Sequence, residues 1–181
     1  MERDDADPDA RAVHIEAEQG YLSELLRIFD ALLRLGEVES GRRKEAFAPL
    51  DLSELVADMA SAYAPVFEDA HKTLQVDGAP GLALEGDREL LEQMLSNLLE
   101  NALEHSRDAA RARIALAPLG SGARLIISDD GPGIPPAHRA RIFERFYRAD
   151  SSRTEPGSGL GLALVKAIAD LHGATIRLDE S

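Results

Sequence analysis

The chain has 181 residues, of which 44% are hydrophobic and 29% charged, a balance typical of a folded domain. Its formal net charge of −13 disfavours a nucleic-acid binder, since phosphate neutralisation needs a basic surface, and the absence of cysteine excludes disulfides and thiolate metal sites. No apolar run reaches the ~20 residues that span a bilayer. We therefore expect a cytoplasmic chain without nucleic-acid partners or direct membrane insertion, whose parent protein can still be membrane-anchored.

The first expected element is a long helix from about residue 8 to residue 36. Its apolar residues recur every three or four positions, as on one face of a helix. They are Leu22, Leu25, Leu26, Phe29, Leu32, Leu33 and Leu35. Such a stripe needs cover, so we expect self-association through this helix, with folding back onto its own domain as the alternative. The segment 39–44 contains a glycine and a basic cluster and predicts a linker.

Three further helices are expected. The first begins around Pro49–Leu52 and ends near Ala70, with Asp51 or Ser53 as its N-cap. The second spans 88–105 behind Asp87, and the last spans about 160–172. Strands are predicted from short apolar or alternating runs at 73–76, 82–84, 113–117, 123–128 and 174–178. This order of elements predicts an α+β fold with helices on one face of a sheet.

Two amides stand one helical turn apart in the expected helix 88–105. They are Asn97 and Asn101, and His105 follows one turn later, so the three share one face. Two amide oxygens one turn apart suit a hard cation such as Mg²⁺, which keeps several waters and takes few protein ligands. A pair of surface amides without a ligand is the simpler alternative.

A carboxylate and two glycines follow the strand 123–128. Asp129, Gly131 and Gly133 are explained by a tight turn, in which glycine and proline are common. The same residues also suit a purine, because an aspartate accepts a hydrogen bond from an exocyclic amine. Glycine lets the ring approach the backbone.

The segment Gly157–Leu162, with the sequence GSGLGL, opens the last helix. Free N–H groups at a helix start bind anions. The segment is not a dinucleotide fingerprint, because no strand ends directly before it and Leu162 stands where that motif needs a third glycine.

Together, in this order and spacing, these segments resemble the ATP-binding catalytic domain of sensor histidine kinases, members of the GHKL ATPase superfamily. The resemblance runs from about residue 50 to the end of the chain. Ser96–Ala102 resembles the N box, Asp129–Pro135 the G1 box, Ile142–Arg148 the F box and Gly157–Leu162 the G2 box.

The resemblance implies a GHKL-type α/β sandwich, a mixed sheet with helices on one face, preceded by the long N-terminal helix. Residues 1–45 would be a remnant of the dimerisation and phosphotransfer hairpin, and 46–181 the ATP-binding catalytic domain, lacking the family's usual last strand.

ATP and Mg²⁺ are the cofactors that the resemblance implies. Asp129 would bind the adenine amino group, with Gly131 and Gly133 lining the base. Asn101 would ligate Mg²⁺, with Asn97 and His105 close by.

For the phosphates, the resemblance implies the backbone amides of Gly159, Leu160 and Gly161, flanked in the same site by Ser158 and Leu162. Arg148 would reach the terminal phosphate, and the residues between it and Gly157 would form a lid. Arg145 and Arg153 are interpreted as solvated charges.

The function implied is transfer of the γ-phosphate of ATP to a histidine outside this chain, with a response regulator receiver domain as partner of the full-length kinase. The chain has no phosphoacceptor box, since the residues after His14 lack its Arg-x-Pro part. Asn97 stands where hydrolytic relatives such as gyrase carry a glutamate base, and asparagine cannot take a proton. An ATPase motor and a non-catalytic GHKL-fold nucleotide-binding or dimerisation module remain as alternatives.

Overall fold

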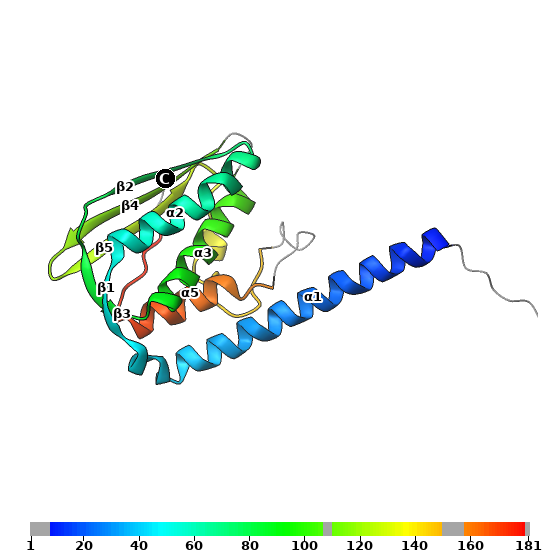
Figure 1. The fold of residues 1–181 in the computed structure, drawn as a ribbon, viewed down its shortest axis with the longest axis horizontal. Helices are drawn as coiled ribbons and strands as arrows, with labels where there is room; N and C mark the ends of the chain where they lie inside the picture. Colours follow the sequence, from blue (N-terminus) through cyan, green and yellow to red (C-terminus); the bar gives the residue numbers. More distant parts are fainter. Residues whose placement is uncertain (1–7, 107–109, 150–157, 180–181) are drawn as a thin grey trace, which may run out of the picture.

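The computed structural model describes residues 8–106, 110–149 and 158–179. It has a two-layer core, which confirms the expected fold class (Figure 1). Helices α2 (Leu52–Asp69) and α3 (Arg88–His105) cover one face of a sheet, and α5 (Gly161–Leu171) packs against α3. The core between the layers is aliphatic, and its fully buried side chains include Leu55, Phe67, Leu95, Leu99 and Ile114.

The main sheet is mixed. Strand β4 (Arg111–Leu119) pairs in parallel with β2 (Thr73–Gly78) and antiparallel with β5 (Gly122–Asp129), which confirms the strand pair expected at 113–117 and 123–128. A separate antiparallel pair joins β1 (Ala48–Asp51) to β3 (Ala83–Gly86). The two runs expected at 73–76 and 82–84 are therefore strands of different sheets.

The helix expected to begin around Pro49–Leu52 begins at Leu52 with Asp51 as its N-cap, but the residues before it form the strand β1, which was not expected. Asp51 has extended backbone angles, and its carboxylate accepts hydrogen bonds from the amides of Ser53 (2.8 Å) and Glu54 (3.3 Å). Because this N-cap fixes the helix start at Leu52, the residues before it are left to pair with β3.

The strand expected at 174–178 was wrong. Within the described range 158–179, no strand is assigned after α5, and this segment is drawn as a plain red coil (Figure 1). The amide of Ala174 donates to the carbonyl of Ala169, the last turn of α5. Alternation of Ile176 and Leu178 gives a strand-like sequence, but a strand also needs a backbone ladder with a partner.

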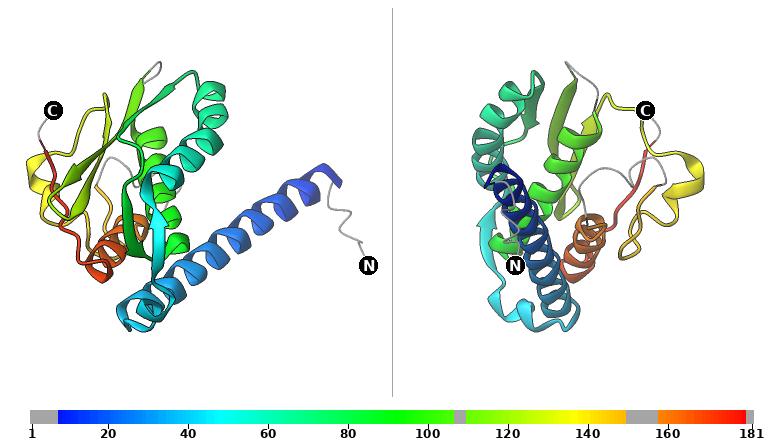
Figure 2. Two further views of the ribbon diagram at one scale, coloured as in Figure 1. Left: turned by 60° about the vertical axis from the view of Figure 1, so that its left-hand side comes forward. Right: turned by 90° about the vertical axis from the view of Figure 1, so that its right-hand side faces the viewer.

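The N-terminal helix α1 (Pro8–Glu39) extends away from the sheet (Figure 2, left) and is followed by a 3-10 helix, η1 (Arg42–Ala46). Its last turn packs on the domain, where Leu35 and Val38 contact Leu90, Leu164 and Ile168. Packing of α1 on its own domain thus covers only the C-terminal end of the apolar stripe. Most of the stripe stays exposed in the single chain, with Leu22, Leu25, Leu26, Phe29 and Leu33 each more than half exposed. No helix in the described ranges is long and apolar enough to cross a membrane.

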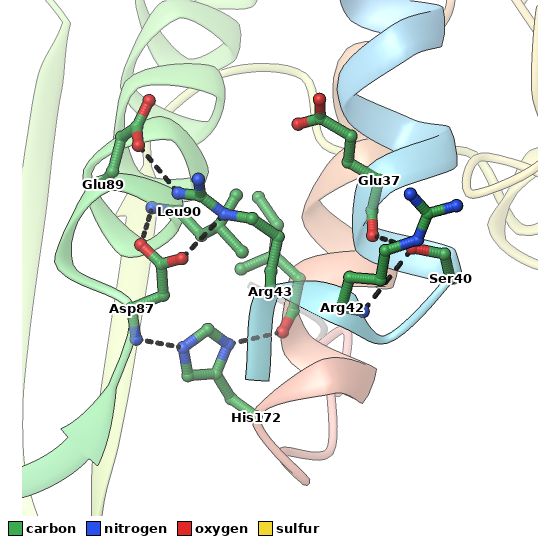
Figure 3. A network of polar contacts seen from close by, with 9 residues as sticks. Glu37, Ser40, Arg42, Arg43, Asp87, Glu89, Leu90 and His172 are labelled. Carbon is green, nitrogen blue, oxygen red and sulfur yellow. Dashed lines mark hydrogen bonds and ion pairs between the residues drawn. The ribbon is translucent and has the colours of Figure 1, made fainter. Parts of the chain in front are cut away.

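A polar network joins η1 to the start of α3 (Figure 3). Asp87 is 4% exposed, and its carboxylate caps α3 by accepting from the amide of Leu90 (3.3 Å). Arg43 lies 2.8 Å from the Asp87 carboxylate and 2.7 Å from that of Glu89. The hydrogen bond with Glu89 raises the pKa of Arg43 and lowers the pKa of Glu89. The guanidinium of Arg43 neutralises the buried carboxylate of Asp87.

The ring of His172 extends this network to the end of α5. Its Nε2 accepts from the amide of Asp87 (3.1 Å), and its Nδ1 lies 2.8 Å from the carbonyl of Ile168. Because a carbonyl only accepts, the proton is on Nδ1. Phe47 stacks on the ring with the centroids 4.5 Å apart. One imidazole therefore links the start of α3 to the end of α5.

Candidate nucleotide-binding site

Helix α3 presents both predicted amides in a fixed orientation. The side-chain nitrogen of Asn97 donates to the carbonyl of Gln93, and that of Asn101 to the carbonyl of Asn97, each over 2.8 Å. Both side chains are half-buried, and the helix is anchored by Leu95 and Leu99, which have no exposed surface. Since the nitrogens are engaged, the amide oxygens are the atoms offered to a ligand.

The first turn of α5 lies directly against Asn97. A Cβ built on Gly161 would be 2.9 Å from the side-chain oxygen of Asn97, so only glycine fits without displacing that amide. Leu160 is 1% exposed and anchors the turn, and its amide donates to Ser158 Oγ (3.3 Å). Among the described residues, no side chain caps α5, which leaves its first N–H groups for an anion.

The F-box segment lies against the same turn. The amide of Phe146 donates to the carbonyl of Gly159 (3.0 Å), and a Cβ on Gly159 would be 2.8 Å from the Phe146 backbone. Gly159 and Phe146 both have a positive φ, +68° and +61° respectively. The neighbouring Tyr147 is held by His138, whose Nδ1 lies 2.6 Å from the tyrosine oxygen, and by Arg141, stacked over its ring. Arg148 follows directly and is half-buried.

The predicted base-binding turn lies at the C-terminal end of α3. The carboxylate of Asp129 accepts from the amide of Gly131 (2.8 Å). A Cβ on Gly131 would lie 2.5 Å from that carboxylate and 3.0 Å from the carbonyl of His105. Local packing alone therefore favours glycine at position 131. Gly133 has φ +67°, which explains glycine there through the turn alone.

Helix α3 therefore connects two groups of predicted residues. Asn97 meets Gly161 near the middle of the helix, and two turns later His105 meets Gly131. The eight-residue separation corresponds to about 12 Å along the axis. Leu162 lies in the first turn of α5 with Gly161. The predicted lid, with Gly157 and Arg153, lies outside the described residues except for Ala149.

The sequence did not predict one contact of the F-box segment, 142–148. Arg145, interpreted as a solvated charge, instead forms an ion pair with Glu39 at the end of α1. The residues are 106 positions apart, and no local pattern in the sequence links them.

A metal in this region would have few protein ligands. In the parts of the chain that the structure describes, no three His, Asp or Glu side chains gather in a way that could hold a metal ion. An amide oxygen together with phosphate oxygens and water fits a magnesium ion bound with a nucleotide.

Comparison with known proteins identifies the family. The model of the histidine kinase-, DNA gyrase B-, and HSP90-like ATPases matches residues 86–181, which include all four boxes. Sensor protein IrlS of Burkholderia pseudomallei is 35% identical over 167 residues, 91% of this chain and 36% of that protein. The histidine-protein kinase/phosphatase MprB of Mycobacterium avium is 34% identical over 176 residues, 96% of this chain and 33% of that protein. The chain thus spans about a third of the length of these curated relatives.

Solved structures agree with this assignment. A mycobacterial sensor histidine kinase MprB structure superposes with a TM-score of 0.61 at 35% identity, over 70% of this chain and 80% of that one. The catalytic domain of histidine kinase ThkA superposes with a TM-score of 0.63 at 26% identity, over 70% and 82% of the two chains. This chain belongs to the family of histidine kinase-, DNA gyrase B- and HSP90-like ATPases, with the fold of histidine kinase catalytic domains.

Proposed function

We propose that this chain is the ATP-binding catalytic module of a two-component sensor histidine kinase, in which 46–181 bind the nucleotide and 1–45 belong to the dimerisation hairpin. The observation that carries the proposal is the contact between Asn97 and Gly161, which brings the N box against the G2 box. It supports the proposal because the Asn97 amide oxygen lies beside the open N-terminus of α5, and an amide oxygen together with free helix N–H groups suits a magnesium-bound polyphosphate.

Each residue of the site has a separate task in this proposal. Asp129 accepts a hydrogen bond from the adenine amino group, and Asn101 supplies an oxygen to Mg²⁺. The amides at the start of α5 hold the phosphates, and Arg148 neutralises the terminal one. When bound, Mg²⁺ neutralises charge on the phosphate oxygens. Asn97 cannot accept a proton, so water is not activated and the γ-phosphate is kept for an incoming side chain.

The acceptor is a histidine outside this chain, and a response regulator receiver domain then takes the phosphoryl group from the full-length kinase. Self-association through α1 is part of the same proposal. Several apolar side chains of α1 are exposed in the single chain, and each would gain roughly 1.5–3 kcal/mol from burial. Two-fold pairing of α1 between copies is the simplest closed arrangement that buries them.

The test is phosphoryl transfer from γ-labelled ATP. The chain alone should yield no acid-labile phosphohistidine, and transfer should begin when an acceptor helix with a His-Glu-Leu-Arg-x-Pro-like box is added in trans. Asp129→Asn serves as the matched control because it weakens nucleotide binding in this proposal. Stable label on His14, or no transfer to any acceptor with nucleotide bound, would contradict the proposal.

A further inference from the structure

Besides the buried Leu35 and Val38, two ion pairs of different character hold the end of α1 and the following η1 on the catalytic domain. The Arg43 pair involves Asp87, whose side chain is 5% exposed. The Glu39 pair involves Arg145, and both side chains are about half exposed, 46% and 51%. Gly41, with φ +72°, lies between Glu39 and Arg43 and turns the chain.

These two pairs differ in how easily they break. Removing Arg43 from Asp87 would strand a buried carboxylate, which is strongly unfavourable. An exposed pair contributes little to stability and is screened by salt. The first attachment therefore acts as a fixed point, and the second can open at low cost.

A cavity lies beside the second attachment. It has a volume of about 470 Å³ and is lined by the end of α1, by Lys44, by Phe143 and Arg145, and by one side of α5. Glu39 and Arg145 are therefore not held by close-packed neighbours on all sides. Their contact can open without repacking the core between α3 and the sheet.

The position of Arg145 connects this contact to the nucleotide site. Its neighbour Phe146 donates its amide to Gly159, at the loop that leads into α5. Glu39 neutralises the guanidinium of Arg145, which removes a positive charge one residue before Phe146 in a chain that carries a net charge of −13. Released from Glu39, the same guanidinium would attract a polyphosphate.

We propose that Arg145 is a further phosphate-attracting residue, which Glu39 holds away from the nucleotide, so that docking of the end of α1 and nucleotide binding oppose each other. This inference depends on the proposed nucleotide site. Because such coupling is reciprocal, nucleotide favours release of Glu39, and release of Glu39 favours nucleotide.

Calorimetric titration with Mg²⁺ and a non-hydrolysable ATP analogue tests the affinity half of the proposal. Glu39→Gln should bind about two- to fivefold more tightly than the parent at low salt, and the gain should vanish at high salt. Glu144→Gln is the control, because it removes the same charge at the residue next to Arg145, but the Glu144 carboxylate pairs with Arg141 instead. In an Arg145→Gln background, Glu39→Gln should have no effect. Equal gains for the two glutamate variants, or a gain that survives in the Arg145→Gln background, would overturn the proposal.

A second measurement reads the docking itself, and its comparison of Glu39→Gln with the parent needs no nucleotide. The chain has no cysteine, so Asp30→Cys on α1 and Asp69→Cys on α2 allow two spin labels at exposed positions. With labelled chain diluted in unlabelled chain, the distance distribution should broaden in Glu39→Gln, and the analogue should broaden it in the parent. An unchanged distribution in both cases would overturn the proposal. A parent that binds no nucleotide would contradict the proposed function instead, while the effect of Glu39→Gln on docking would still be readable.

Discussion

The side-chain oxygen of Asn97 lies 2.9 Å from the position that a Cβ on Gly161 would take. The amide cannot move away freely, because its nitrogen donates to the carbonyl of Gln93 on the same helix. The start of α5 and the amide face of α3 are thus in contact through a residue with no side chain. Any ligand at the start of α5 is therefore next to an amide oxygen of α3.

Gly161→Ala should reduce nucleotide affinity while leaving the fold intact. The added methyl group pushes Asn97 out of position, and we expect binding about 5- to 30-fold weaker, or 1–2 kcal/mol. The free energy of unfolding should fall little, since alanine is the better helix former by up to about 1 kcal/mol. Calorimetry and urea denaturation measure the two effects. Gly36→Ala is the control, because nothing lies within 4 Å of its added Cβ.

Asp129→Asn should weaken binding of adenine nucleotides by about 1–3 kcal/mol. The side chain at 129 must accept a hydrogen bond from the adenine amino group, and the NH₂ group of asparagine is a donor. Asp130→Asn is a neighbouring control. Asp130 accepts from the amide of Arg111 (2.8 Å), a bond that the asparagine oxygen can keep. Competition titrations with ATP and GTP analogues measure the effect, and equal losses in the two variants would contradict the assigned base pocket.

Much of the fold was predictable because its signals are local. Asp51 and Asp87 each precede a periodic apolar run, and each caps a helix in the structure. Strand β1 was missed because it is four residues long and its pairing with β3 depends on residues 32 to 38 positions away. The segment 174–178 was wrongly predicted as a strand, because its sequence alternates like a strand but its backbone pairs with no strand among the described residues.

The residues of the candidate site were selected from a related kind of signal. Gly131, Gly159 and Gly161 lie where the backbone approaches another group closely, and that requirement appears in the sequence as closely spaced glycines. The pair of Glu39 and Arg145 has no such signal, because a charged surface residue looks the same whether it is solvated or paired. The network of Asp87 and His172 was also invisible, since it depends on where two helix ends meet.

Arg43→Met should lower the free energy of unfolding by about 3 kcal/mol, because it leaves the buried carboxylate of Asp87 without its cation. Arg42→Met in the same turn is the control, and we expect an effect within about 0.5 kcal/mol for this exposed residue. Urea denaturation compares the two. Similar losses in both variants would mean that Asp87 is stabilised by other groups.

The contact between Glu89 and Arg43 should make stability depend on pH in the acid range. Its hydrogen bond with Arg43 lowers the folded-state pKa of Glu89 below the ordinary value of 4.5. A lowered carboxyl pKa contributes stability above the unfolded-state value, and this contribution is lost as the pH falls through the folded-state value. The difference in unfolding free energy between the parent and Glu89→Gln should be constant near neutral pH, on the order of 0.5 kcal/mol for an exposed pair, and should shrink below about pH 4.5. Urea denaturation over a pH series measures it, and a difference that grows in acid would contradict the assignment.

Phe29→Asp should dissociate self-associated chain, because it places a carboxylate in the exposed apolar stripe of α1, where Phe29 is 58% exposed. Leu119→Asp is the matched control: it makes the same kind of change at a residue 53% exposed, at the end of β4. Sedimentation analysis over a wide concentration range compares them. Nucleotide affinity should be nearly unchanged in both, and a parent that stays monomeric throughout would contradict pairing through α1.

The most direct test of the account is calorimetric titration of the parent chain with a non-hydrolysable ATP analogue, with and without Mg²⁺, alongside Asn101→Ala. We predict binding to the parent that strengthens when Mg²⁺ is added, and a variant that loses most of this strengthening because a cation ligand is gone. The same response to Mg²⁺ in the parent and in Asn101→Ala, or no binding to the parent at all, would contradict the assignment of this site to a magnesium-bound nucleotide.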